Sequence, residues 1–236
     1  MIFSVIGNGK TGGVIQEVVK KNGETLVLPT NDLFTEEPLA FDEKIEGMID
    51  FSHPNNISKI LEYVKKNNTA VVIGTTGLSD EHFKMIEEMA HYSPVIYSAN
   101  YSLGVILMNK LVAEANRVLL DWDVEVIEKH HNQKVDAPSG TANLFLNTIL
   151  NDRKAELVYG REGSSKRVKE EIGVHSLRGG TLSGEHEVCF MGIDEVLSVK
   201  HEAFSNKIFA EGAVHAATWL VGKPNGLYTM EDVLFK

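Results

Sequence analysis

Short apolar runs alternate with segments of helical periodicity over the first hundred residues. IFSVI at 2–6, MIDF at 48–51 and AVVI at 70–73 have the length and composition of buried strands. Residues 14–22 and 55–66 carry apolar side chains at helical spacing. Further strands are expected at 25–28 and 95–97, and a helix capped by Ser79 at 80–90. Strands alternating with helices predict a parallel sheet with right-handed crossovers.

The pattern changes after about residue 103. DVEVIE at 123–128 alternates apolar and acidic residues, as a half-exposed strand does. Residues 151–171 are charged without a clear apolar period, so a mobile loop is expected there. Helices are expected at 103–119, 141–150 and 206–221, a last short helix after Thr229, and alternating strands at 172–178, 186–191 and 196–202. A dinucleotide-type half is therefore followed by a half with an antiparallel or mixed sheet.

Composition limits the class of protein. The 236 residues are 43% hydrophobic and 24% charged, as in an ordinary globular chain of one large or two small domains. No apolar run approaches the roughly 20 residues of a membrane span. Met1 leads into a strand-like segment without a signal-peptide pattern, so a cytoplasmic protein is expected. One cysteine, Cys189, excludes an internal disulfide and a thiolate zinc cluster.

The formal net charge of −10 disfavours a nucleic-acid-binding surface. Binding to phosphates along a nucleic acid needs clustered Lys and Arg side chains. If the ligand of this chain is anionic, its site must be locally positive against the acidic background.

A glycine-rich turn follows the first strand. Gly7, Gly9 and Gly12 match G-x-G-x-x-G between a strand and a helix start, the context of the dinucleotide-binding fingerprint. The first glycine permits a tight turn, the second admits a pyrophosphate, and the third allows close helix packing. A turn that is merely rich in glycine is the alternative, but position and spacing favour phosphate binding. Lys10 either adds positive charge there or is a solvated loop lysine.

The choice of nicotinamide cofactor stays open. The fingerprint expects an acidic residue at the end of the second strand, where it binds the ribose 2′-hydroxyl. Residues 28–31, LPTN, supply none; the nearest acid is Asp32, and no arginine for a 2′-phosphate is evident. NADH, NADPH or both are therefore expected as cofactors.

Acid–base candidates gather in EKHHNQKVDAPSGTA at 128–142. His130 and His131 can exchange protons near neutral pH, and Lys134 can donate a proton or bind a carboxylate. The turn 139–141 precedes a helix, so its backbone N–H groups could hold an anion. Ordinary polar loop histidines and a Pro-Ser helix entry are the alternative. A metal site is disfavoured, because adjacent histidines do not easily share a tetrahedral ion.

The same segment resembles a known family. Glu128, His130, His131, Lys134 and the run DAPSGTA at 136–142 closely resemble the signature of 4-hydroxy-tetrahydrodipicolinate reductase, long called dihydrodipicolinate reductase. Other matching stretches, in order, are GNGKTGG at 7–13, DFS at 50–52, GTTG at 74–77, SANYSLGV at 98–105, RGGTLSGEH at 178–186 and FAEGAVHAATWL at 209–220. The resemblance covers essentially the whole chain.

This resemblance implies an α/β fold: a Rossmann-like nucleotide-binding domain with an inserted α+β substrate and oligomerisation domain built on an open mixed sheet. The implied boundaries are 1–102 and 207–236 for the first domain and 103–206 for the second. The implied assembly is a homotetramer whose second-domain sheets pack together. Domain closure over the substrate is expected, with hinges near 102 and 207.

The family pattern also implies residue roles. His130 corresponds to the proton donor or acceptor, and Lys134 to the proton donor. The implied substrate-binding positions are His131, Ser139, Gly140 and Thr141. The implied cofactor contacts are Gly7, Asn8, Gly9, Lys10, Thr11, Gly12, Phe51, Gly74, Thr75, Thr76, Ser98, Ala99, Asn100 and Tyr101.

The implied reaction belongs to the diaminopimelate route of lysine biosynthesis. Loss of the 4-hydroxyl of a cyclic dicarboxylate as water precedes hydride addition at ring C4 from NAD(P)H. Two rivals are another two-domain Rossmann oxidoreductase acting on a small sugar or amino acid, and a non-enzymatic cofactor sensor or scaffold. The histidine pair joined to DAPSGT disfavours the first, and the complete set of matched residues disfavours the second. The segment 178–186 is left outside the expected site.

Overall fold

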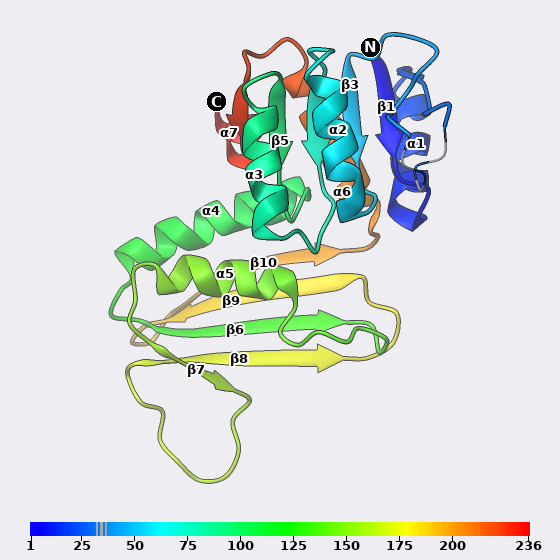
Figure 1. The fold of residues 1–236 in the computed structure, drawn as a ribbon. Coiled ribbons are helices and arrows are strands. Elements are labelled where there is room, and N and C mark those ends of the chain that lie inside the picture. The colour runs from blue at the N-terminus through cyan, green and yellow to red at the C-terminus, as the bar shows by residue number, and fades with distance from the viewer. Residues whose placement is uncertain (32, 34, 36) are drawn as a thin grey trace. The chain divides into compact units, whose positions relative to one another are not determined.

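The computed structural model describes residues 1–31, 33, 35 and 37–236. These residues form two compact units (Figure 1), of which unit 1 comprises Met1–Leu103 and Lys207–Lys236 and unit 2 comprises Gly104–Asn206. Unit 1 is discontinuous in sequence, because the C-terminal segment packs with the first hundred residues. None of the described helices is both long and apolar enough to cross a membrane.

Sheet A of unit 1 is the expected parallel sheet. Its strands are β1 (Ile2–Ile6), β2 (Thr25–Leu26), β3 (Gly47–Asp50), β4 (Ala70–Ile73), β5 (Pro94–Tyr97) and β11 (Gly226–Tyr228). They are all parallel, in the order β11-β5-β4-β3-β1-β2. Every residue of β3 and β4 is buried, as expected of strands covered on both faces. The strand order reverses between β1 and β3, so a crevice for ligands is expected at that edge.

Helices cover both faces of sheet A (Figure 1). They are α1 (Lys10–Lys21), the 3₁₀ turn η1 (Pro54–Asn56), α2 (Ile57–Val64), α3 (Asp80–Met89), α6 (Lys207–Leu220) and α7 (Met230–Phe235). The helices α2 and α3 lie on one face, and α1 and α6 pack together on the other. The helix α1 begins four residues before the predicted start, because the glycine turn itself leads into it with Gly9 as N-cap. Ser79 and Thr229 are the N-caps of α3 and α7, as predicted.

Unit 2 is built on a five-stranded mixed sheet. Its elements are α4 (Leu103–Val118), β6 (Asp123–His130), α5 (Gly140–Leu150), β7 (Glu156–Tyr159), β8 (Glu171–Arg178), β9 (Gly184–Met191) and β10 (Val196–Ala203). The strand order of sheet B is β10-β9-β6-β8-β7. Apolar side chains of α4 and α5 form one core with inward residues of β6, β8 and β9, among them Val126, Phe145 and Phe190. The predicted α/β class with a separate mixed sheet is confirmed.

Two short strands depart from the expectations. The predicted mobile loop at 151–171 is wrong in part, because β7 lies within it and pairs in parallel with β8. Leu157 packs against the core of unit 2, a contact that the charged flanking residues hide in the sequence. The strand β11 was not predicted; it has three residues and pairs with β5 at the edge of sheet A. Strands this short at a sheet edge carry too few residues to show a period.

Candidate active site

The turns that follow four strands of sheet A lie at one edge of unit 1. The strands β1, β3, β4 and β5 are parallel, and β3 and β4 stand between β1 and β5 in the sheet. The turns after their carboxyl ends begin at Gly7, Phe51, Gly74 and Ser98. Parallel strands bring these four turns to the same edge, where open α/β sheets bind ligands. The fold therefore gathers all the predicted cofactor positions.

The three glycines of the first turn differ in what their missing side chains allow. Gly7 has a φ of +119°, and a Cβ there would lie 2.3 Å from the carbonyl oxygen of Phe51. A Cβ on Gly12 would lie 2.1 Å from the carbonyl oxygen of Gly7. Gly9 has no heavy atom within 4 Å of a built Cβ. Gly7 and Gly12 are thus required by the fold, whereas Gly9 leaves open space beside the start of α1.

The N-terminus of α1 suits an anion. Gly9 gives no side-chain cap, and the first turn carries no acidic residue, so the first N–H groups of the helix are available. Asn8, Lys10 and Thr11 around it are exposed. The residues present therefore fit a pyrophosphate group.

Two of the other predicted cofactor residues are anchored inside unit 1. Tyr101 is buried, and its hydroxyl donates to the carbonyl of Ile73 over 2.7 Å. The Phe51 ring lies 5.5 Å from the Tyr101 ring and occupies the space a Cβ of Gly74 would need. These two aromatic side chains therefore support the turn after β4 from inside unit 1.

The remaining positions of these turns divide between inward and outward side chains. The Thr75 hydroxyl donates to the buried carboxylate of Asp50 over 2.6 Å. The Ser98 hydroxyl donates to the carbonyl of Asn100 over 2.6 Å, which closes the turn after β5. Thr76 and Ala99 are exposed. Thr75 therefore presents its backbone to the edge of the sheet, and Thr76 presents its side chain.

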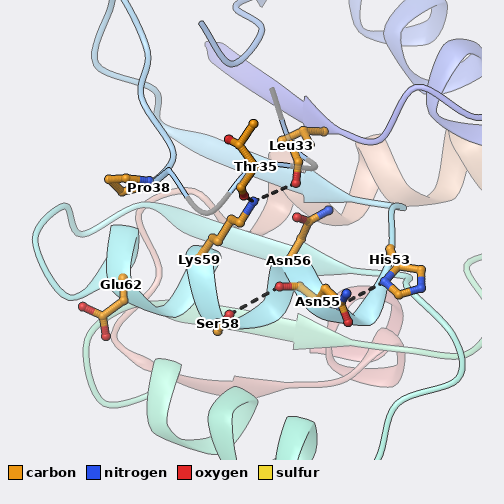
Figure 2. Close-up of a pocket in the computed structure, with 9 residues that line it drawn as sticks. All are labelled: Leu33, Thr35, Pro38, His53, Asn55, Asn56, Ser58, Lys59 and Glu62. Atoms are coloured by element: carbon orange, nitrogen blue, oxygen red, sulfur yellow. Dashed lines mark hydrogen bonds between the residues drawn. The ribbon is translucent and has the colours of Figure 1, made fainter. Parts of the chain in front are cut away.

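A pocket of about 340 Å³ lies beside the beginning of α2 (Figure 2). The Lys59 ammonium donates to the carbonyl of Leu33 over 2.7 Å and to that of Thr35, and so ties the segment after β2 to α2. The acid nearest the end of β2, Asp32, lies outside the described residues. The lining residues are Leu33, Thr35, Pro38, His53, Asn55, Asn56, Ser58, Lys59 and Glu62.

In unit 2, the expected acid–base residue His130 is held by a buried carboxylate. Glu128 and His130 point to the same face of β6, because they stand two residues apart on a strand. The Glu128 carboxylate is fully buried and lies 2.6 Å from His130 Nδ1. A proton on Nδ1 then donates to Glu128, which leaves Nε2 to meet a ligand. A Cβ on Gly184 would lie 2.9 Å from this Nε2, so glycine keeps that side of the ring open.

Arg178 completes the environment of Glu128. Its two terminal nitrogens donate to the two carboxylate oxygens over 2.8 and 2.7 Å, a bidentate ion pair. One of these nitrogens also donates to the carbonyl of Asp136 over 2.6 Å. Burial opposes ionisation of Glu128, but the hydrogen bonds from Arg178 and His130 outweigh it and lower the pKa of the carboxyl below its ordinary value. The carboxylate therefore stays ionised at neutral pH.

Ser139 and His186 close the cluster from the other side. The Ser139 hydroxyl caps α5 by accepting from the Ala142 N–H over 3.1 Å, and it lies 2.9 Å from His186 Nε2. The Ser139 N–H donates to Glu128 over 3.2 Å. The polar groups of Ser139 are thus engaged within the protein. Gly140 is exposed and Thr141 half-buried, which leaves the first turn of α5 nearer to solvent.

The two histidines of the cluster are both shifted toward the neutral form. Burial lowers the pKa of His130 against the raising effect of Glu128. Burial, together with the nearby His130, lowers the pKa of His186 to about 4. The two rings meet edge to face with centroids 5.1 Å apart. At neutral pH the fixed positive charges beside His130 are therefore Arg178 and Lys134.

Lys134 and His131 lie in the loop after β6. The Lys134 ammonium pairs with Asp136 over 2.8 Å, its side chain is 22% exposed, and its charge lies near enough to lower the pKa of His130. The N–H of His131 donates to the carbonyl of Leu182 over 2.9 Å. The loop after β6 is thus joined to the β8–β9 connection, and the Lys134 side chain in this loop is partly exposed.

Three members of this cluster lie outside the site that the sequence predicts. Arg178 and His186 belong to the segment 178–186, and Glu128 belongs to the family signature without a predicted role. Arg178 and His186 lie 50 and 47 residues from their partners along the chain. The matching stretch RGGTLSGEH was the one available signal, since it begins and ends with these two residues.

Chemically, unit 2 offers a neutral imidazole and a partly exposed ammonium near the start of α5, where the Gly140 N–H and the Lys134 ammonium both bond to Asp136. This set can bind a carboxylate and transfer a proton near neutral pH. Among the described residues, no group of three or more His, Cys, Asp or Glu side chains is arranged to hold a metal ion.

Comparison with known proteins gives one consistent family. The families described as "Dihydrodipicolinate reductase, N-terminus" and "Dihydrodipicolinate reductase, C-terminus" match residues 10–101 and 104–234. A 4-hydroxy-tetrahydrodipicolinate reductase of Clostridium novyi (strain NT) is 43% identical, with 96% of this chain and 95% of the relative covered. That of Brachyspira hyodysenteriae (strain ATCC 49526 / WA1) is 42% identical, with 97% of each chain covered.

Solved structures share the fold at lower identity. Dipicolinate-bound dihydrodipicolinate reductase from Paenisporosarcina sp. TG-14 has a TM-score of 0.76 at 24% identity, with 97% of each chain covered. The DAP dehydrogenase of C. glutamicum in complex with DAP has a TM-score of 0.56 at 11% identity, covering 98% of this chain and 92% of the other. These likenesses bear on the fold.

Proposed function

The chain belongs to the dihydrodipicolinate reductase family, and from that premise we propose how its residues carry out the reaction. It is an NAD(P)H-dependent oxidoreductase that converts 4-hydroxy-tetrahydrodipicolinate to tetrahydrodipicolinate in diaminopimelate and lysine biosynthesis. The observation that carries the residue assignment is the Glu128–His130–Arg178 cluster, because it supplies an oriented imidazole beside an accessible ammonium.

Unit 1 is the nucleotide-binding domain in this proposal. The glycine turn and the start of α1 hold the pyrophosphate, and the turns after β3, β4 and β5 hold the rest of the cofactor. The bound cofactor supplies the hydride. The protein's own contribution is the row of backbone N–H groups and the open space beside Gly9, which admit the anion.

Unit 2 is the substrate-binding domain. The substrate is a small dicarboxylate, in line with the dipicolinate bound to the solved relative from Paenisporosarcina sp. TG-14. Lys134 and His131 bind one carboxylate, and the N–H groups of Gly140 and Thr141 at the start of α5 bind the other. The fixed charge of Arg178 adds to the local positive field in a chain of net charge −10.

His130 and Lys134 divide the proton chemistry. Hydride addition at C4 sends negative charge toward the ring nitrogen of the substrate. The Lys134 ammonium stabilises that charge and donates a proton. His130 is neutral at pH 7, because its pKa is lowered, and its Nδ1 is bonded to Glu128. Its Nε2 can therefore accept a proton and pass it on.

Substitution of the two residues tests this assignment. His130→Ala and Lys134→Ala are each expected to cut kcat by about 10²-fold or more, the scale of acid–base catalysis. Steady-state kinetics with freshly made 4-hydroxy-tetrahydrodipicolinate measures this. The dissociation constant for NADH is expected to stay at the parent value, and Lys169→Ala, an exposed lysine of unit 2, serves as control. Near-normal turnover in both variants would show that the roles are wrong.

The cofactor preference is the second part of the proposal. Residues 28–31 carry no charged side chain that would select for or against a 2′-phosphate. We therefore expect the enzyme to use both cofactors, with kcat/KM for NADH and NADPH within about tenfold, a difference of about 1.4 kcal/mol. Initial rates with each cofactor decide the matter, and a preference of a hundredfold or more contradicts it.

A cytoplasmic homotetramer is the assembly we propose. Exposed apolar side chains stand on and beside β10, among them Val196 at 60% and Phe204 at 87% exposure, and contact between copies would cover them. Light scattering should give a mass four times the 26.1 kDa of the chain. A monomer mass at micromolar concentration contradicts the tetramer and leaves the chemistry unaffected.

A further inference from the structure

A buried carboxylate stands beneath the cofactor turns of unit 1. Asp50 ends β3 and is fully buried. It accepts hydrogen bonds from the hydroxyls of Ser52 and Thr75, the second over 2.6 Å. Ser52 belongs to the turn after β3, and Thr75 to the turn after the neighbouring β4. One side chain therefore joins two turns that are 23 residues apart in sequence.

The two hydroxyl oxygens of this network also accept hydrogen bonds. The Thr75 hydroxyl oxygen accepts from the N–H of Ser52 over 2.9 Å, and the Ser52 hydroxyl oxygen accepts from the Asn56 side-chain amide over 3.0 Å. Both hydroxyl protons are then left to point at Asp50, and the ionised carboxylate accepts one of them on each oxygen. Burial raises the pKa of Asp50 to about 6, against the hydrogen bonds from Ser52 and Thr75, so it is ionised at neutral pH.

The network also reaches the glycine turn. The backbone of Phe51 lies between Asp50 and Ser52, and its carbonyl oxygen stands 2.3 Å from where a Gly7 Cβ would be. The Phe51 ring fills the space beside Gly74. A shift of Phe51 would therefore move the walls of three turns at once.

Stability alone gives little reason for this arrangement. A buried carboxylate loses hydration, and a well-packed apolar group of the same volume is often as stable or more so. A network with every hydrogen-bonding direction satisfied does, however, define a single local geometry. This network lies at the edge of sheet A that the proposed function assigns to the cofactor.

We propose that Asp50 is a positioning residue for the reduced cofactor: its carboxylate locks the turns after β3 and β4 together in the geometry that binds NAD(P)H. The inference rests on the proposed function in assigning those turns to the cofactor. Asp50 itself does not touch the cofactor and acts through Ser52 and Thr75.

The test measures NADH binding in the full-length protein. Asp50→Asn, Ser52→Ala and Thr75→Val are each expected to raise the NADH dissociation constant about tenfold, since each leaves buried hydrogen-bonding groups without partners. Fluorescence titration gives the dissociation constant. Steady-state kinetics should show KM for NADH rising more than kcat falls. The double variant Asp50→Asn/Thr75→Val should bind NADH about as weakly as the weaker single variant, because both act through one network.

Thr69→Val is the matched control. Thr69 is as deeply buried as Thr75 and undergoes the same substitution, but it stands at the opposite end of β4, where its hydroxyl bonds to the Ile45 carbonyl. It is expected to lower the Tm while leaving the NADH dissociation constant at the parent value. If Thr75→Val and Thr69→Val lower the Tm alike and neither changes NADH binding, Asp50 is merely structural and the inference is overturned.

The remaining outcomes are also decisive. If Asp50→Asn does not fold, Ser52→Ala and Thr75→Val settle the question, because each removes one hydroxyl and keeps the carboxylate. If the parent protein binds neither NADH nor NADPH, the proposed function fails, and this role falls with it. Normal parent binding with unchanged constants in all three variants overturns only the role of Asp50.

Discussion

At the scale of single residues, the properties of His130 depend on what surrounds it. An exposed histidine titrates near pH 6.5, and its neutral form can carry the proton on either ring nitrogen. Here Glu128 selects the Nδ1 proton, and burial shifts the ring toward its neutral form. Arg178 in turn keeps Glu128 ionised through two hydrogen bonds. The chemistry expected of His130 is therefore set by two residues that need not touch the substrate.

Glu128→Gln tests this dependence. The substitution removes a negative charge that favours the imidazolium form and leaves the Arg178 charge uncompensated, so both effects lower the pKa of His130 further. NMR titration of the His130 ring should show this fall, and kcat should drop by about tenfold or more as the tautomer becomes less well defined. A His130 pKa at or above the parent value would contradict the assigned electrostatics.

At the scale of elements, the glycine turn separates the needs of folding from those of binding. Gly12 leaves no room for a Cβ, because the carbonyl oxygen of Gly7 would stand 2.1 Å away. Gly9 has open space instead. Both glycines belong to one fingerprint, yet only one of them is required by the packing of α1 against β1.

Matched alanine substitutions should therefore behave differently. Gly12→Ala is expected to reduce the free energy of unfolding by about 1–3 kcal/mol, the usual cost of overpacking. Gly9→Ala is expected to keep the parent Tm while raising the NADH dissociation constant, because its methyl group occupies the space proposed for the pyrophosphate. Calorimetry and NADH titration give both quantities. Parent-like NADH binding in Gly9→Ala would place the pyrophosphate elsewhere.

At the scale of the whole molecule, each unit carries a buried titratable group, and these two groups change the free energy of unfolding in opposite directions as the pH rises. The pKa of Asp50 in unit 1 is raised to about 6, so its contribution to stability is present below about pH 4 and lost as the pH rises through 6. The pKa of His186 in unit 2 is lowered to about 4, so its contribution is present above about pH 6.5 and lost as the pH falls through 4. Each pKa shift corresponds to a change of about 3 kcal/mol in the free energy of unfolding across its pH range.

The two tryptophans allow each unit to be followed by itself. Trp219 lies in unit 1 and Trp122 in unit 2, so single-tryptophan versions made by Trp122→Phe or Trp219→Phe report one unit each. Between pH 4 and 7, the free energy of unfolding of Asp50→Asn relative to the parent should rise by about 2–3 kcal/mol in the Trp219 signal. That of His186→Asn should fall by a similar amount in the Trp122 signal. Slopes of the same sign would contradict the two pKa directions.

Much of the architecture was predictable because its signals are local. The alternation of strands and helices, the glycine fingerprint and the caps at Ser79 and Thr229 each depend on residues within a few positions of one another. The strand β7 was missed because its half-buried pattern is short and its flanks are charged. The strand β11 was missed because only its pairing with β5 defines it.

The candidate site likewise has features that depend on local sequence and features that depend on long-range contacts. The sequence by itself determined the family, the α/β class and the segment that holds His130 and Lys134, since side-chain period and motif spacing are properties of the chain alone. Tertiary structure alone decided that Arg178 meets Glu128, that His186 meets Ser139 and that Asp50 joins two turns. Those contacts depend on the register between strands far apart in sequence, and packing of the whole unit sets that register.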